Sequence, residues 1–382
     1  MKERNENIRY ALLISLNTMM LCSGLGFTTY YLLDAQIEDS DIGILIAVSC
    51  LLAVLLQQVF GRAVDSGRAE GKKLLIFLDV IMILSAIFVL FVDSSFVKAV
   101  IFGLLLCLTL TMQPILNAFT FFYQSHGVAV NYGIARGCGS LSFAIMSIII
   151  GFLTVHFGSV IVPLSYLVFC AAFCWVTISM PNLRGNTSNT HSTKTLQLSQ
   201  FPAFGWMLAG LSLVMIFHNS VMMYFIRVVE NVGGDSGDLG LALAIAAVVE
   251  IPALFLYTRI KGNTPSKIFL AISGVAFFAK AALFLLASQI WIIFAVQLMQ
   301  FLSYAVAVGA RVYYVNETFS AAYQVTAQAY VVATETIGIV LGSILGGFIV
   351  QLGGVNALLW FGTITAFLGM LSMIYSANYK VR

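Results

Sequence analysis

A succession of long apolar segments, separated by short polar breaks, constrains this chain more than any other feature. A bilayer core about 30 Å thick needs about 20 apolar residues per helical span, and lipid offers backbone polar groups no partner outside the helix. Only 9% of the residues are charged, against about 25% in an average soluble domain. We therefore predict an all-α membrane protein with twelve transmembrane helices in two six-helix bundles. The segments lie near residues 9–33, 41–61, 73–92, 96–123, 134–155, 158–180, 202–228, 238–258, 266–287, 290–315, 321–350 and 355–377.

One long polar stretch, rich in Asn, Ser and Thr, divides the chain into two halves. It predicts an N-terminal bundle at 1–180, a cytoplasmic linker at 181–201 and a C-terminal bundle at 202–382. A short pattern of the first half also recurs in the second half at a constant offset of 197. Halves related in this way carry their substrate site near the membrane midplane, between the repeats. The matching residues are Asp41, Gly43, Ala47 and Arg62 in the first half and Asp238, Gly240, Ala244 and Arg259 in the second.

The basic residues lie in alternate loops, which predicts the orientation of the chain. Lys and Arg near the ends of spans stay on the cytoplasmic side, whereas acidic residues have little effect. Both termini and the loop around Arg62 and Lys72 fall on the basic face, while the loop DAQIEDSD falls on the opposite face. We expect a multi-pass protein of the cytoplasmic (inner) membrane with both termini in the cytoplasm.

Composition also limits the function. With 19 basic and 16 acidic residues, no face is basic enough to indicate nucleic acid. The six cysteines show no metal-ligand spacing, and the sequence has no phosphate-binding loop, zinc motif or nucleophile elbow. We expect no enzymatic activity, no metal and no cofactor.

The loop after the second segment, GRAVDSGRAEGKK, resembles the signature loop of the major facilitator superfamily. The resemblance rests on Gly61, Asp65, Gly67, Arg68, Lys72 and Lys73, while Ser66 stands where the family usually has Arg. It implies that Gly61, Asp65 and Arg68 form a conformational latch on the cytoplasmic face. Such a latch holds one conformation and breaks when the protein opens inward.

The chain is also similar to one branch of that superfamily, the oligosaccharide/proton symporters and nucleoside permeases, which includes lactose permease. The likeness covers the second segment, DIGILIAVSCLLAVLLQQVFGRAVDS, and then Pro114 to Phe119, Tyr132 to Ser140 and the segment around Glu250. It implies proton-coupled symport of a sugar, oligosaccharide or nucleoside by alternating access. We expect a monomer whose partners are a small solute, protons and the lipid bilayer.

Charged side chains inside spans are the candidates for chemistry, because a charge in mid-membrane costs about 2.5 kcal/mol or more and normally faces a bundle interior or an aqueous cavity. Arg311 and Glu317 lie close enough to span ends to reach the membrane surface. Three acids then oppose two bases, so at least one carboxylate is expected to lack a basic partner, as a reversible proton carrier requires. The five charges within spans are Asp79, Arg136, Glu250, Lys280 and Glu335.

Arg136 is the first candidate for substrate binding, because its planar fork can hold two oxygens of a hydroxylated ligand. The resemblance places it at the family's sugar-binding Arg and Phe143 at an aromatic position that stacks on the ligand. It places Asn117 where lactose permease has an acid. Arg136 as an interfacial anchor and Phe143 as a core residue remain alternatives.

The second half supplies the other substrate-binding candidates. Glu250 matches the family's acid between the halves, and Lys280 and Gln300 are spaced like the base of its ninth helix and the His of its tenth. His218 lies beside Asn219 and Ser220, which suggests a polar cluster facing the cavity. A structural Glu250–Lys280 pair and a packing role for His218 are the alternatives.

Proton coupling is expected to differ from lactose permease, because Gln300 and Ser303 replace its His and Glu. We predict that Glu335, Glu250 or Asp79 carries the proton. Three other functions stay open. Lys280 and Arg136 could together hold the carboxylate of an organic acid; drug/proton antiport is opposed by the lack of a Gly-Pro-rich motif in the fifth segment; and the chain could be a non-transporting membrane sensor.

Overall fold

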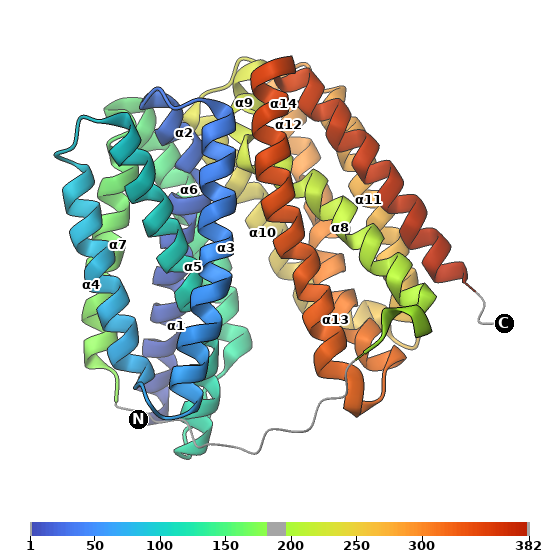
Figure 1. Ribbon diagram of the computed structural model, residues 1–382, viewed down its shortest axis with the longest axis horizontal. Helices are drawn as coiled ribbons and strands as arrows, with labels where there is room; N and C mark the ends of the chain where they lie inside the picture. Colours follow the sequence, from blue (N-terminus) through green and yellow to red (C-terminus); the bar gives the residue numbers. More distant parts are fainter. Residues whose placement is uncertain (1, 182–195, 380–382) are drawn as a thin grey trace. The chain divides into compact units, whose positions relative to one another are not determined.

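The computed structural model of the chain describes residues 2–181 and 196–379 (Figure 1). Within these ranges every regular element is helical. The chain divides into two compact units, Met1–Asn189 with Leu239–Ala244, and Thr190–Asp238 with Ile245–Arg382. Most of the predicted linker at 181–201 lies outside the described residues.

The first unit consists of six membrane-crossing segments. The first segment is α1 (Lys2–Leu21), a π-helical turn (Cys22–Gly26) and α2 (Thr28–Asp34). In the described residues, α1 packs along α6 and α7, α3 along α5, and α4 along α5 and α7. The other five segments are α3 (Asp39–Asp65), α4 (Gly71–Val89), α5 (Ser95–Ser125), α6 (Tyr132–Phe157) and α7 (Ile161–Ser179).

The second unit repeats this plan with more interruptions. A 3-10 turn (Leu198–Gln200) precedes α8 (Pro202–Met223), which continues into α9 (Phe225–Asn231). The long α14 (Ala321–Asn378) has a non-helical residue inside it, Gly354, at φ 71°. The remaining elements are α10 (Ser236–Lys261), α11 (Ser266–Leu285), α12 (Ile290–Gln297), a 3-10 turn (Leu298–Gln300), a π-helical turn (Phe301–Ala305) and α13 (Val306–Thr318).

The helices account for twelve crossings. Ten helical stretches of the described chain are long and apolar enough to span a membrane. The last of them contains two segments joined at Gly354. The 19-residue α4 adds one more, since it is an apolar helix of similar length that also carries Lys72, Lys73 and Asp79. The predicted all-α architecture of twelve transmembrane helices is confirmed.

Glycines let two helices of the second unit approach closely. A Cβ on Gly210 of α8 would lie 2.9 Å from the carbonyl oxygen of Gly369, and a Cβ on Gly369 of α14 would lie 3.0 Å from that of Gly210. Lipid gives no hydrophobic drive for helix association, so small residues that permit close packing take its place. This contact joins the first and last helices of the unit.

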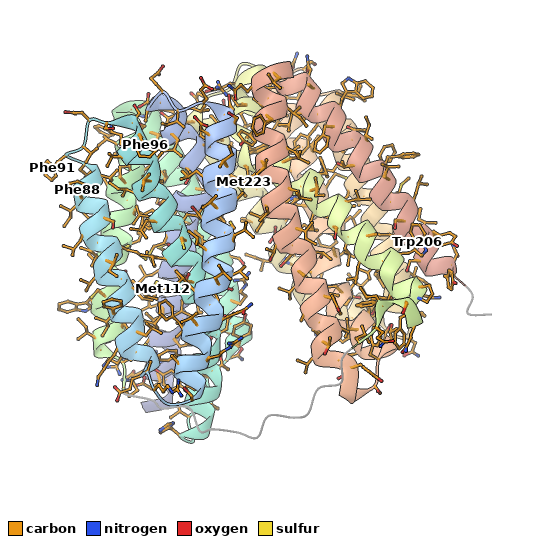
Figure 2. All side chains as sticks on the ribbon, in the orientation of Figure 1. Phe88, Phe91, Phe96, Met112, Trp206 and Met223 are labelled. Atoms are coloured by element: carbon orange, nitrogen blue, oxygen red, sulfur yellow. The ribbon has the colours of Figure 1, made fainter. Side chains whose placement is uncertain are left out.

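The outer surface is apolar and suits lipid. Phe88, Phe91 and Phe96 project outward where α4 ends and α5 begins, whereas Met112 lies inside the bundle (Figure 2). The chain has four tryptophans, and all of them are exposed: Trp175, Trp206, Trp291 and Trp360. Tryptophan collects at the two membrane–water interfaces, so this distribution is typical of a multi-pass membrane protein.

Candidate substrate and coupling sites

A chain of polar side chains crosses three helical segments of the second unit. The Lys280 ammonium on α11 donates to Oε1 of Gln300 at 2.5 Å, and Nε2 of Gln300 donates to Oε1 of Glu250 on α10 at 2.8 Å. Lys280 is 0% exposed and Gln300 is 4% exposed, while Glu250 is half-buried. The structure thus brings together three predicted substrate-binding residues, and Gln300 bridges the predicted Glu250–Lys280 pair.

The orientation of the Gln300 amide follows from its two neighbours. An ammonium can only donate hydrogen bonds and an ionised carboxylate can only accept them, so the amide oxygen must face Lys280 and the amide nitrogen must face Glu250. Opposite charges therefore stand at the two ends of one neutral linker. Hydroxyl groups, which both donate and accept, are suited to replace any link of this chain.

Aromatic rings adjoin the polar chain. His218 of α8 stacks on Tyr304, with ring centroids 4.8 Å apart and planes 21° apart, and meets Phe277 edge-on at 6.1 Å. Tyr304 lies four residues after Gln300, and Phe277 lies three residues before Lys280, so these rings sit one turn away from the polar chain. His218 is thus held between rings, and sequence reasoning missed Tyr304, whose spacing from Gln300 was the available signal.

An ion pair joins α13 and α14. Nη1 of Arg311 lies 2.6 Å from Oε1 of Glu335, and the two side chains are 13% and 27% exposed. Arg311 was expected to reach the membrane surface, and this expectation is wrong: its guanidinium turns to the acid on the neighbouring helix. Glu335, the first candidate for proton coupling, therefore has a basic partner.

Asp79 of α4 is the acid that has no basic partner among the described residues. It is 0% exposed, and neither carboxylate oxygen has a hydrogen-bond partner within the described part of the chain. The thiols of Cys170 and Cys174 on α7 lie beside it. Thiols are weak donors, and an acid buried within a span without a basic partner is a candidate for function.

The first unit carries the other three substrate-binding candidates. Arg136 is exposed near the start of α6, and Phe143, half-buried, lies seven residues later on the same face of the helix. Asn117 is exposed on α5. No hydrogen bond or ion pair joins these three to one another among the described residues, so their common role stays a prediction.

Lys72 anchors the predicted latch loop. Gly67 takes φ 71° directly after α3, a conformation suited to glycine. Nζ of Lys72 donates to the carbonyl oxygens of Ile178 and Met180, at 2.9 and 2.5 Å, which ties the loop to the end of α7. Gly61 lies within α3 and Arg68 is exposed, whereas the side chain of Asp65 lies outside what the structure describes.

The second unit has its own polar cluster between α10 and α11. Nζ of Lys261 lies 2.8 Å from Oε1 of Glu317, and Glu317 also accepts hydrogen bonds from the backbone nitrogen and the hydroxyl of Ser266, at 2.8 and 2.9 Å. Glu317 is exposed near the end of α13, as expected of a residue close to a span end, and it ties this end to the start of α11. Sequence reasoning missed this cluster.

Comparison with known proteins decides the family. A sequence model described as the MFS_1-like family matches residues 19–361, most of the chain. The chain belongs to the major facilitator superfamily. The family consists of secondary transporters of small molecules rather than enzymes, as the sequence predicts.

Two similar proteins and one similar solved structure are also named as transporters. A Deinococcus radiodurans protein named as a sugar efflux transporter is 27% identical over 45% of this chain, and the match spans about half, 48%, of that protein. The maltose permease of Geobacillus stearothermophilus is 21% identical over 90% of this chain and 88% of its own. A crystal structure of a mutant of the nucleoside transporter NupG covers 97% of this chain and 98% of its own at 13% identity, with a TM-score of 0.82, which shows the fold.

Proposed function

We propose that this transporter couples the uptake of a small, neutral, hydroxylated solute, a sugar, oligosaccharide or nucleoside, to the entry of protons. The observation that carries the proposal is the chain from Lys280 through Gln300 to Glu250. It presents donors and acceptors together in an apolar bundle, which is the chemistry that hydroxyl groups require. The relatives named for sugars and the fold of a nucleoside transporter support the same class.

The alternative of an organic acid fits the second unit less well. A carboxylate substrate needs a cation whose charge is available, but Glu250 already opposes the charge of Lys280 through Gln300. Binding a second carboxylate there would set like charges close together in a site of low dielectric, which is costly. A neutral solute meets no such penalty.

The proton is assigned to Glu335, with Asp79 as the second candidate and Glu250 as the third. Protonation of Glu335 removes its negative charge, weakens its bond to Arg311 and so loosens α13 from α14. Asp79 is a candidate for a different reason, because it is an acid buried within a span and has no basic partner among the described residues. Alternating access then links either event to the exposure of the solute site.

Transport by purified protein in proteoliposomes tests the function. We expect radiolabelled maltose or uridine to accumulate when the interior is alkaline, and unlabelled neutral glycosides or nucleosides, but not benzoate or lactate, to compete. Accumulation that needs no pH gradient would remove proton coupling from the proposal. Competition by carboxylates alone would replace the solute class with organic acids, and absence of any flux would favour a sensor.

Two variants separate the proton candidates. Glu335→Gln should abolish accumulation driven by a pH gradient while downhill exchange of labelled for unlabelled solute continues. The double variant Glu335→Gln with Arg311→Gln removes both charges and guards against a folding defect. Asp79→Asn is the parallel test, and Asp93→Asn, an exposed acid after α4, is the control. Unchanged accumulation in a variant dismisses that residue.

A further inference from the structure

A groove of about 450 Å³ runs along the first unit between α1 and the first turns of α6. Its walls are mostly apolar and come from both helices, with Ile8 and Leu12 on α1 and Ile134 and Cys138 on α6. All four of these side chains are exposed. In a bilayer such a surface faces acyl chains, and none of the residues proposed for solute or proton binding lines it.

The length of the groove matches one leaflet of a membrane. It extends along α1 from Arg4 to Ser15. At 1.5 Å per residue these positions are about 16 Å apart, and half of a hydrocarbon core about 30 Å thick is about 15 Å. Arg4 is also the first residue of the candidate span Arg4–Gly26, so its charge lies at the end of the groove nearest the membrane surface.

Among the described residues that line the groove, Arg4 is the charged one. Arg4 makes no hydrogen bond or ion pair among the described residues, whereas Arg9, one turn further on, is bound to Glu6 at 2.7 Å. Asn7 ties α1 to the loop that precedes α6. Its Nδ2 donates to the carbonyl oxygen of Ala129 at 2.9 Å, and its Oδ1 accepts from the backbone nitrogen of Asn131 at 2.8 Å. Arg4 is thus the group that meets a ligand's headgroup.

We propose that this groove binds one anionic phospholipid, with its phosphate on the Arg4 guanidinium and one acyl chain along Ile8, Leu12, Ile134 and Cys138. A guanidinium binds phosphate in bidentate fashion, and a basic residue at the membrane surface contributes to the retention of anionic lipid. The lipid fills a groove that would otherwise leave apolar walls poorly packed in the bilayer. The site is independent of the solute and of the proton.

Delipidated protein in neutral detergent tests the proposal by binding and by thermal stability. Phosphatidylglycerol should raise the melting temperature and remain bound in native mass spectrometry, phosphatidylcholine should do so less, and inorganic phosphate should do neither. Arg4→Gln should weaken phosphatidylglycerol binding about fivefold, which corresponds to the loss of about 1 kcal/mol per basic residue. Lys73→Gln makes the same charge change at an exposed position outside the groove and should leave binding intact.

A second variant separates the groove from the charge. Cys138→Trp fills the groove while Arg4 remains, and it should lower the binding of both lipids without loss of folded protein on size exclusion. Equal phosphatidylglycerol binding by Arg4→Gln and Lys73→Gln would overturn the proposal. So would unchanged lipid binding by Cys138→Trp, or protection by inorganic phosphate alone, which would make the site one for a soluble anion.

Discussion

Gln300 holds together the polar chain of the second unit, because it is the only link between a buried ammonium and a carboxylate that the described contacts give. Replacing it by Leu leaves Lys280 without its acceptor. A buried polar group that loses its partner costs about 1–3 kcal/mol, and more when the group is charged. We expect Gln300→Leu to lower the free energy of unfolding by at least that amount, measured as a lower melting temperature of the purified protein.

Exchanging the side chains of Gln300 and Glu250 distinguishes a structural role of the polar chain from a role in binding the solute. The double variant Gln300→Glu with Glu250→Gln moves the carboxylate next to Lys280 and keeps every hydrogen bond of the chain. It should restore the melting temperature and still weaken solute affinity about tenfold, a change of about 1.4 kcal/mol. Wild-type affinity in the exchanged protein would show that the chain is architectural.

The predictability of single residues depended on whether their partners were visible along the sequence. Glu250, Lys280 and Gln300 were predicted as members of one substrate site; the structure joins these three by hydrogen bonds, and their binding of solute stays a prediction. The Arg311–Glu335 pair was missed because it joins two helices, and the position of Arg311 near a span end suggested an interfacial side chain. Nothing in the spacing indicated which acid would remain alone, since that depends on the side chains that neighbouring helices bring to it.

The break in α14 at Gly354 gives a testable prediction. Gly354 divides α14 by taking φ 71° and ψ -175°, a conformation that essentially only glycine adopts and that costs any other residue about 1–3 kcal/mol. Gly354→Ala should therefore lower the melting temperature. Gly205 in α8 is the matched control, because a Cβ at either position meets no atom within 4 Å but only Gly354 has positive φ. Gly205→Ala should be neutral or stabilising, and equal effects would contradict the role of φ.

The boundaries of the elements follow from the sequence wherever polar residues or glycine end an apolar run. The break between 350 and 355 was predicted, and the structure places it at Gly354. The irregular backbone at Leu298–Ala305 was not predicted, because its residues suit an ordinary α-helix equally well. The stretch also has a tertiary contact that the sequence does not reveal: Ser273 of α11 donates to the carbonyl oxygen of Ser303 at 2.6 Å, and the same oxygen accepts from the backbone nitrogen of Val306.

Orientation in the membrane is a property of the whole molecule, and α4 offers a direct test. Ser66 and Ser94 are exposed positions before and after this one helix. The distribution of Lys and Arg predicts that Ser66 faces the cytoplasm. With native cysteines replaced, Ser94→Cys should react with a membrane-impermeant maleimide in right-side-out vesicles, and Ser66→Cys should react only after the membrane is opened. The reverse pattern would contradict the predicted topology.

The fold as a whole was predictable because lipid permits so few arrangements of a chain this apolar. The number of crossings and the family both follow from segment length and from one loop. A shared site was harder to predict, since it depends on groups in different halves. Arg136 belongs to the first unit and Lys280 to the second, so their action on one solute stays a prediction.

The tight turn at Leu298–Gln300 is followed at once by the wide turn at Phe301–Ala305. One has about 3.0 residues per turn, fewer than the about 3.6 of an α-helix, and the other has more, so the two deviations offset each other in helical phase. Gln300 can therefore take a position about the helix axis that an unbroken α-helix would not give it, while α12 and α13 keep nearly the same helical phase on either side.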